Sequence, residues 1–215
     1  MTPGWLERIG KRLGLYWQLK AVGTPLFMLL FFWVYFSILN NPRTVPTVMP
    51  VIWLDHWVGF VPSAFPVYAS LWFYVSLPPA LMGNMRALLL FALWMGAMCL
   101  FCLGLFWLFP TRIPVFPIDW SLYPGLAMIK DADASGNACP SLHVTSAVFS
   151  AYWLNRILAQ LAAPAALRWV SALLCAAILW STMASLQHVA LDVIGGLIVG
   201  CAFAAASLWH VKATG

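Results

Sequence analysis

The chain has 215 residues, of which 63% are hydrophobic and only 8% are charged, and its mean hydropathy is +0.89. A soluble domain carries about a quarter charged residues, so the composition excludes a soluble globular protein. The 11 Lys and Arg outnumber the six Asp and Glu. They are scattered between apolar runs and form no basic stripe, which excludes a nucleic-acid-binding surface. We therefore predict an all-α, polytopic membrane protein.

Six apolar runs approach the length of about 20 residues that a helix needs to cross a bilayer. They extend over residues 21–39, 65–82, 87–111, 141–163, 168–184 and 188–209. Residues 1–20 read as a cytoplasmic amphipathic leader, because the bulky first run lacks the small residues that end a cleavable signal peptide. We expect residues 1–215 to form one six-span helical bundle, in which Gly195, Gly196 and Gly200, with Ala202, serve helix packing.

Cysteine usage indicates no disulfide framework and no metal site. Four of the five cysteines fall inside apolar runs, where thiols act as small apolar fillers, and only Cys139 lies in a polar stretch. We therefore expect no metal and no cofactor.

The distribution of cations predicts the orientation, because Lys and Arg accumulate on the cytoplasmic side of a membrane. With the N-terminus inside, eight cations fall on the inner side and three on the outer side. The inner set is Arg8, Lys11, Arg12, Lys20, Arg86, Arg156, Arg168 and Lys212, and the outer set is Arg43, Arg112 and Lys130. We predict a multi-pass protein of the cell (inner) membrane with both termini in the cytoplasm.

Three segments with polar side chains lie at junctions between an odd-numbered run and the next even-numbered run. They contain Arg112, the pair Ser141 and His143, and the pair His188 and Asp192. Ionisable residues at such places are natural functional candidates. Because successive spans alternate in direction, all three junctions face the same outer side and can meet there.

The residue types at these junctions fit phosphoryl transfer. His188 and Asp192 are four apart and share a helix face, so the carboxylate can fix the imidazole tautomer. Ser141 and His143 occupy a helix start, where free backbone N–H groups bind anions, and the fork of Arg112 suits phosphate oxygens. One histidine can attack phosphorus while the other protonates the leaving oxygen.

The motifs resemble those of the type 2 phosphatidic acid phosphatase (PAP2) superfamily, whose patterns are K-x6-R-P, P-S-G-H and S-R-x5-H-x3-D. Pro140-Ser141-Leu142-His143 is similar to the second motif with Leu in place of Gly. Ser181-Thr182, His188 and Asp192 match the third motif with Thr in place of Arg. Residues 109–114 resemble a degenerate first motif in which Leu105 stands in place of Lys. The substitutions resemble the branch that includes inositol phosphorylceramide synthases and their bacterial relatives, as do residues 54–68 more weakly.

The resemblance implies a role for each matching residue. His188 corresponds to the nucleophile, Asp192 to its orienting carboxylate and His143 to the general acid. Ser141 and Arg112 correspond to ligands of the phosphate oxygens. Because two motif cations are missing, a dianionic headgroup would bind less strongly unless Lys130 or Arg43 reaches the pocket.

Asp55 lies on the outer loop, where it lines the pocket or faces water.

The expected function is a metal-independent lipid phosphatase, with phosphatidate, a polyprenyl phosphate or diphosphate, or a phospholipid headgroup donor as substrate. One alternative is a lipid headgroup phosphotransferase that uses the same residues. A non-catalytic lipid or anion carrier is less favoured, because mid-helix charges expected of a transport path are absent. A metal site would have only His143, His188 and Asp192 to offer. Membrane lipids are the expected partners, nucleic acid is not, and the oligomeric state is left open.

Overall fold

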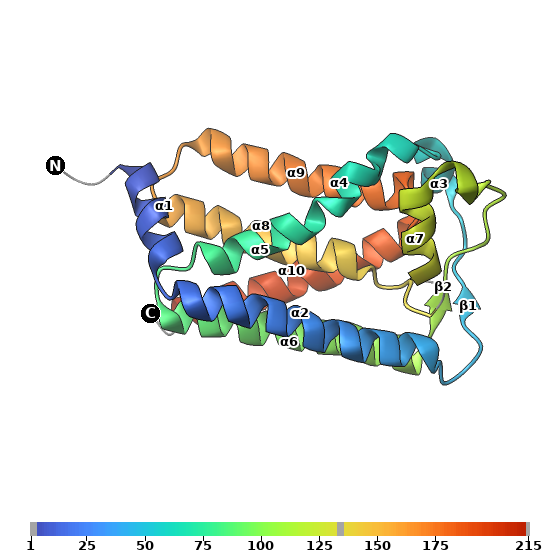
Figure 1. Cartoon of the computed structure of the whole chain (residues 1–215), viewed down its shortest axis with the longest axis horizontal. Helices are drawn as coiled ribbons and strands as arrows, with labels where there is room; N and C mark the ends of the chain where they lie inside the picture. The colour runs from blue at the N-terminus through green and yellow to red at the C-terminus, as the bar shows by residue number, and fades with distance from the viewer. Residues whose placement is uncertain (1–3, 133–135, 214–215) are drawn as a thin grey trace.

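The computed structural model describes residues 4–132 and 136–213, and its long helices lie side by side with both ends of the chain at one end of the bundle (Figure 1). The helices are α1 (Trp5–Gly14), α2 (Trp17–Asn40), α3 (Trp53–Val58), α4 (Phe65–Ala69), α5 (Leu71–Ala80), α6 (Met85–Leu108), α7 (Pro124–Ala132), α8 (Leu142–Gln160), α9 (Ala165–Ala184) and α10 (Ala190–Ala213). Two short 3₁₀ turns (Pro62–Ala64 and Trp120–Leu122) and two two-residue strands, β1 (Thr47–Val48) and β2 (Thr111–Arg112), complete the fold.

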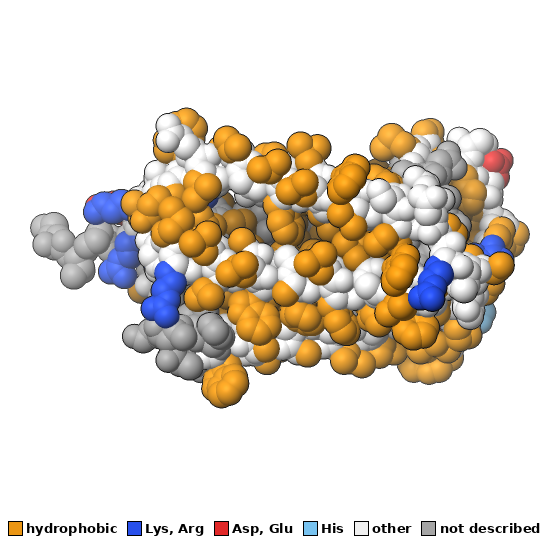
Figure 2. All heavy atoms as spheres, turned by 90° about the horizontal axis from the view of Figure 1, so that it is seen from below, with side chains coloured by type: hydrophobic (Ala, Val, Ile, Leu, Met, Phe, Trp, Pro, Cys, Tyr) orange, Lys and Arg blue, Asp and Glu red, His pale blue; other side chains and the backbone are white. Residues whose placement is uncertain are grey.

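Four helices of the described chain, α2, α6, α9 and α10, are long and apolar enough to cross a membrane. Their mean hydropathy ranges from 1.5 to 2.4. Figure 2 shows hydrophobic side chains covering one long face of the bundle, with the Lys and Arg side chains toward its two ends. The expectation of a helical, multi-pass membrane protein is confirmed at this level.

The first long helix begins earlier than its apolar run predicts. α2 starts at Trp17 and includes Lys20, which is buried. The Lys20 ammonium donates to the carbonyls of Arg12 (2.6 Å), Ala80 (2.9 Å) and Met82 (3.0 Å). These three bonds satisfy the donors of the ammonium and fasten the amphipathic α1 to the end of α5.

The second apolar run is divided into α4 and α5 at Ser70, where the chain turns. The Ser70 amide donates to the carbonyls of Pro66 and Val67, so the two short helices remain linked by hydrogen bonds. This break brings residues of α4 to the end of the bundle where α8 begins.

The junction between α8 and α10 is the tightest helix contact near the predicted site. A Cβ atom on Gly196 would lie 2.6 Å from the carbonyl oxygen of Ser141, and one on Gly200 would lie 2.8 Å from that of Thr145. The Thr145 hydroxyl also donates to the Gly196 carbonyl at 3.2 Å. Glycine at these positions therefore lets the two backbones approach closely, as the sequence predicts.

The segment before α8 is held by a small ladder that the sequence does not predict. β1 pairs in parallel with β2, which contains Arg112. The Thr111 carbonyl accepts the Ala138 amide, and the Thr111 hydroxyl accepts the Cys139 amide at 2.8 Å. These bonds fix the approach of the chain to the start of α8.

Candidate active site

The ends of α6 and α9 and the starts of α8 and α10 lie at one end of the bundle, opposite the chain termini (Figure 1). The expectation that the three polar junctions share one end is confirmed.

His188 lies just before α10 rather than within it. Its amide donates to the Thr182 carbonyl (3.1 Å), and its side chain is only 4% exposed. The Nδ1 atom lies 3.5 Å from Asp192 Oδ2, an ion-pair distance longer than a hydrogen bond. Among the described residues neither imidazole nitrogen has a hydrogen-bond partner. Because buried polar atoms are normally paired, His188 is a group poised for a ligand.

Asp192 is fully buried in the first turn of α10. Its Oδ2 accepts the Val189 amide at 3.0 Å, while Oδ1 has no partner among the described residues. The carboxylate is thus fixed by its own helix start and turned toward the His188 ring, which is the position that an orienting carboxylate requires.

His143 occupies the first turn of α8, and its ring centroid lies 5.7 Å from that of His188. Its Nε2 atom lies 2.6 Å from the hydroxyl of Tyr68, a buried residue of α4. The two rings are also in contact, with centroids 4.6 Å apart. A group bound at His188 can therefore be reached by His143 and by the tyrosine behind it.

Ser141 is the N-cap of α8. Its hydroxyl accepts the Val144 amide at 3.3 Å, and its own amide donates to the Asp192 carbonyl at 3.0 Å. The side chain is fully buried. Ser141 thereby joins the start of the helix carrying His143 to the start of the helix that follows His188.

Asp55 reaches the site as an acceptor of backbone amides. Its Oδ1 accepts the Ala190 amide (2.7 Å) and its Oδ2 accepts the Ile52 amide (2.8 Å). Because Ala190 is the first residue of α10, the carboxylate caps that helix two residues beyond His188.

The three outer cations, Lys130, Arg112 and Arg43, have different surroundings. Lys130 on α7 donates to the Leu186 carbonyl at 2.8 Å and lies over the Trp120 ring, which places it beside the turn that carries His188. Arg112 is held through its backbone in the ladder, and among the described residues its guanidinium has no hydrogen bond or ion pair. Arg43 instead stacks on Trp107 of α6.

Two candidate residues escape prediction from the sequence. Tyr68 sits inside an apolar run, and only the fold brings its hydroxyl to His143. Asn137 lies in a polar loop, yet it is 7% exposed, and both side-chain polar atoms lack partners among the described residues. Its buried, unpaired amide lines the same cavity as the two histidines and is the kind of group that binds a polar ligand.

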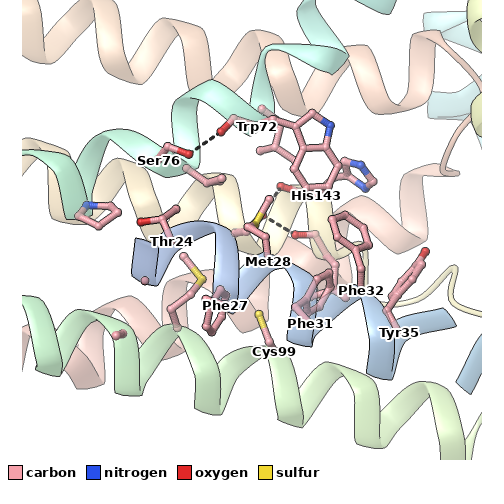
Figure 3. Close-up of a pocket in the computed structure, with 18 of the residues that line it drawn as sticks. Thr24, Phe27, Met28, Phe31, Phe32, Tyr35, Trp72, Ser76, Cys99 and His143 are labelled. Carbon is pink, nitrogen blue, oxygen red and sulfur yellow. Dashed lines mark hydrogen bonds between the residues drawn. The ribbon is translucent and has the colours of Figure 1, made fainter. Parts of the chain in front are cut away.

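An elongated cavity of about 680 Å³ is lined in part by the two histidines. Figure 3 shows side chains of α2, α5, α6 and α8 facing it, with His143 at one side and a wall of aromatic and sulfur-containing residues. Apart from His143, His188, Tyr68 and Asn137, its lining is mainly apolar. Lining residues such as Phe36 and Trp72 are partly exposed, so the cavity also opens sideways on the bundle.

The thiol of Cys139 borders the start of α8. Burial, and then the charge of Asp192, raise its pKa to about 11, so it stays protonated at neutral pH. Within residues 4–132 and 136–213, no group of three His, Cys, Asp or Glu side chains is placed to hold a metal ion.

Comparison with protein families identifies a match to the PAP2 superfamily over residues 105–214. That range includes Arg112, Ser141, His143, His188 and Asp192 but neither Tyr68 nor Asp55. A comparison with curated proteins and another with solved structures each found no match. The family match covers half of the chain and the motifs that the fold brings together, and the chain belongs to the PAP2 superfamily.

Proposed function

We propose that this protein is an integral membrane phosphatase that hydrolyses a lipid phosphate monoester or diphosphate through a phosphohistidine. Membership of the superfamily suggests lipid phosphatase or phosphotransferase activity in general. The observation that carries the proposal is His188, a buried imidazole without a hydrogen-bond partner among the described residues, which faces a second histidine in the lining of an apolar cavity.

In the first step, the lone pair of His188 Nε2 attacks phosphorus and the bond from phosphorus to the leaving oxygen breaks. Asp192, 3.5 Å from Nδ1, stabilises the positive charge that develops on the ring. His143 donates a proton to the leaving oxygen. The products of this step are a phosphohistidine and a lipid alcohol or lipid monophosphate.

In the second step, His143 removes a proton from a water molecule that attacks the phosphohistidine, and the phosphorus–nitrogen bond breaks. Inorganic phosphate and free His188 result. Tyr68, 2.6 Å from His143 Nε2, orients the imidazole and can pass the proton on. We regard Tyr68 as a positioning residue for this histidine.

The phosphate oxygens need donors in a site with few cations. We assign this role to Asn137, whose amide is buried and unpaired, and to the first-turn amides of α8, because a helix N-terminus favours anions. Lys130 contributes positive charge from beside Leu186. Arg112 remains a candidate whose side chain would close on a bound headgroup. Ser141 and Asp55 act by holding the starts of α8 and α10.

The cavity supports a substrate with a long hydrocarbon chain. Its wall follows α2 from Leu19 to Phe36, which corresponds to about 25 Å of helix. This is more than half of the roughly 30 Å hydrocarbon thickness of a bilayer. A polyprenyl chain can occupy such a length, whereas the tails of a diacyl lipid are confined to one leaflet. We therefore favour a polyprenyl phosphate or diphosphate over phosphatidate.

We further propose six spans, with the linked helices α4 and α5 as the second and α8 as the fourth. α8 is 19 residues long and packs against α5, α9 and α10, so its polar residues need not face lipid. With the cation-rich end in the cytoplasm, the histidines lie at the outer face of the cell membrane.

The test is phosphate release by purified protein from a polyprenyl diphosphate, a polyprenyl monophosphate and phosphatidate. We expect His188→Ala to lower the rate at least about 10³-fold, as loss of a covalent nucleophile does, and vanadate to inhibit the wild type. Asn137→Asp should raise KM because it sets a carboxylate against the phosphate, whereas Asn41→Asp, on an exposed asparagine at the end of α2, serves as control. An unchanged rate of phosphate release in His188→Ala would contradict the proposal, and no release from any of the three substrates by the wild type would favour a carrier.

The closest rival is headgroup transfer, in which an alcohol replaces water in the second step. The deep burial of His188 favours this alternative because it restricts the access of water. The same assay with an acceptor alcohol decides: transfer of the phosphoryl headgroup without free phosphate identifies a phosphotransferase, and undiminished phosphate release identifies a phosphatase.

A further inference from the structure

A second cavity, of about 310 Å³, lies at the end of the bundle opposite the histidines. Its walls come from α1, the turn before α6, the start of α6 and the end of α8, and they carry the side chains of Arg12, Arg86 and Arg156. Three helices distant in sequence thus converge on one concave, basic site.

The positive charge of this cavity has no counterpart in the described chain. No Asp or Glu lines it, and Glu7 of α1 already pairs with Lys11 at 3.0 Å. Among the described residues, the guanidinium groups of Arg86 and Arg156 form no hydrogen bond or ion pair. Three uncompensated cations in one concave site favour an anion over water.

The geometry favours a phosphate group. Arg12 is held against the turn, because its Nε lies 2.8 Å from where a Cβ of Gly83 would be and its terminal nitrogen donates to the Leu81 carbonyl at 3.4 Å. The 24-residue helix α6 begins here, capped by Asn84, and its positive end adds to the field. Planar guanidinium forks bind phosphate oxygens in pairs.

We propose that this arginine cavity binds a phosphate group, carried by an anionic glycerophospholipid of the leaflet at that end of the bundle. Basic pockets between membrane helices on the cytoplasmic side are suited to anionic headgroups. The cavity is far from the histidines and shares no lining residue with the catalytic cavity. The inference therefore does not depend on which reaction the histidines carry out.

The experiment is native mass spectrometry of the full chain. The protein in detergent is mixed with phosphatidylglycerol or phosphatidylcholine, and the fraction of protein that retains each lipid after release from the detergent is measured. We expect wild-type protein to retain phosphatidylglycerol in preference to phosphatidylcholine, and Arg86→Gln/Arg156→Gln to lose about 25-fold in apparent affinity, since each of the two charges contributes roughly fivefold. Arg168→Gln removes an exposed cation at the same end that does not line the cavity, and it should retain the lipid as the wild type does. Arg86→Lys/Arg156→Lys should recover part of the binding.

Competition with inorganic phosphate at millimolar concentration distinguishes a site for free phosphate from a site for a lipid headgroup. Displacement of phosphatidylglycerol by phosphate indicates a site for the phosphate group itself, and resistance to displacement indicates that the lipid is the ligand. Equal retention of phosphatidylglycerol in the double Gln variant and in Arg168→Gln overturns the proposal. If the double variant does not melt cooperatively, Arg86→Gln and Arg156→Gln replace it, and equal retention in both overturns the proposal as well.

Discussion

The helices on the two sides of His143 pack in opposite ways. On one side, α8 meets α10 so closely that a single added methyl group at Gly196 would collide with the backbone of Ser141. On the other side, α2, α5 and α6 stand apart around a cavity of about 680 Å³. We call the contact between α8 and α10 around Gly196 the seam, and the cavity between α2, α5 and α6 the open side. The seam holds the starts of the two helices in a fixed position, and the open side leaves room for a hydrocarbon chain whose shape varies.

This contrast matches the demands of the two parts of a lipid phosphate. Phosphoryl transfer requires a fixed geometry, and a misplacement of about 1 Å can cost about 10²-fold in rate. Hydrocarbon binding requires only apolar area removed from water or lipid, and aromatic and Met side chains provide it without directional bonds. The contacts from His143 to Trp72 (6.0 Å between ring centroids) and from Trp72 to Phe32 (5.3 Å) join the two regions.

Breaking the seam should have the largest effect. In Gly196→Ala the new Cβ would lie 2.6 Å from the Ser141 oxygen and 2.9 Å from Val144 Cβ, so α8 and α10 must separate. We expect a loss of about 1–3 kcal/mol in stability, as for other overpacked sites, and a fall in activity of about 10²-fold as the histidines shift. Thermal melting in detergent and phosphate release measure the two effects.

Gly104→Ala is the matched control for this change. Gly104 lies within α6, and a Cβ there would meet no atom within 4 Å. Its melting temperature and activity should stay at the wild-type level. A Gly196→Ala protein as active as Gly104→Ala would show that the seam does not set the geometry of the site.

Filling the open side should have a smaller and more selective effect. Thr24 faces the cavity from α2, well away from His143 (Figure 3). In Thr24→Trp the indole occupies space that a long chain would use, so we expect KM for a long polyprenyl phosphate to rise about tenfold, the scale on which pockets reject extra methylenes. A short-chain, water-soluble analogue should keep its KM and kcat.

Leu26→Trp provides the comparison, because Leu26 is exposed on α2 and does not line the cavity. It should leave both substrates unaffected. A rise in KM for both the short and the long substrate in Thr24→Trp would indicate a general distortion of the bundle instead of a site for the tail.

Most features of the seam could be predicted from the sequence, whereas few features of the open side could. The spacing of His188 and Asp192 and the pair Gly196 and Gly200 are local patterns, and the fold realises both of them. The places of Tyr68 and Asn137 in the site could not be predicted. A single polar side chain in an apolar run or a loop gains a role only from partners far along the chain. The double role of Asp55 as an acceptor of the Ile52 and Ala190 amides likewise depends on a contact across 135 positions.

The smallest expected effect concerns Cys139, at the edge of the seam. Burial and the nearby Asp192 charge raise the pKa of this thiol to about 11, so the reactive thiolate is scarce at pH 7 and increases only as the pH approaches that value. Labelling with a maleimide, followed by peptide mapping at Cys139, should be slow at pH 7 and accelerate steadily up to pH 10. Asp192→Asn removes the negative charge and should speed labelling a few-fold at a given pH, by lowering the pKa of the thiol. If both proteins label at the same rate, the Asp192 charge does not reach the start of α8, and its influence ends at His188.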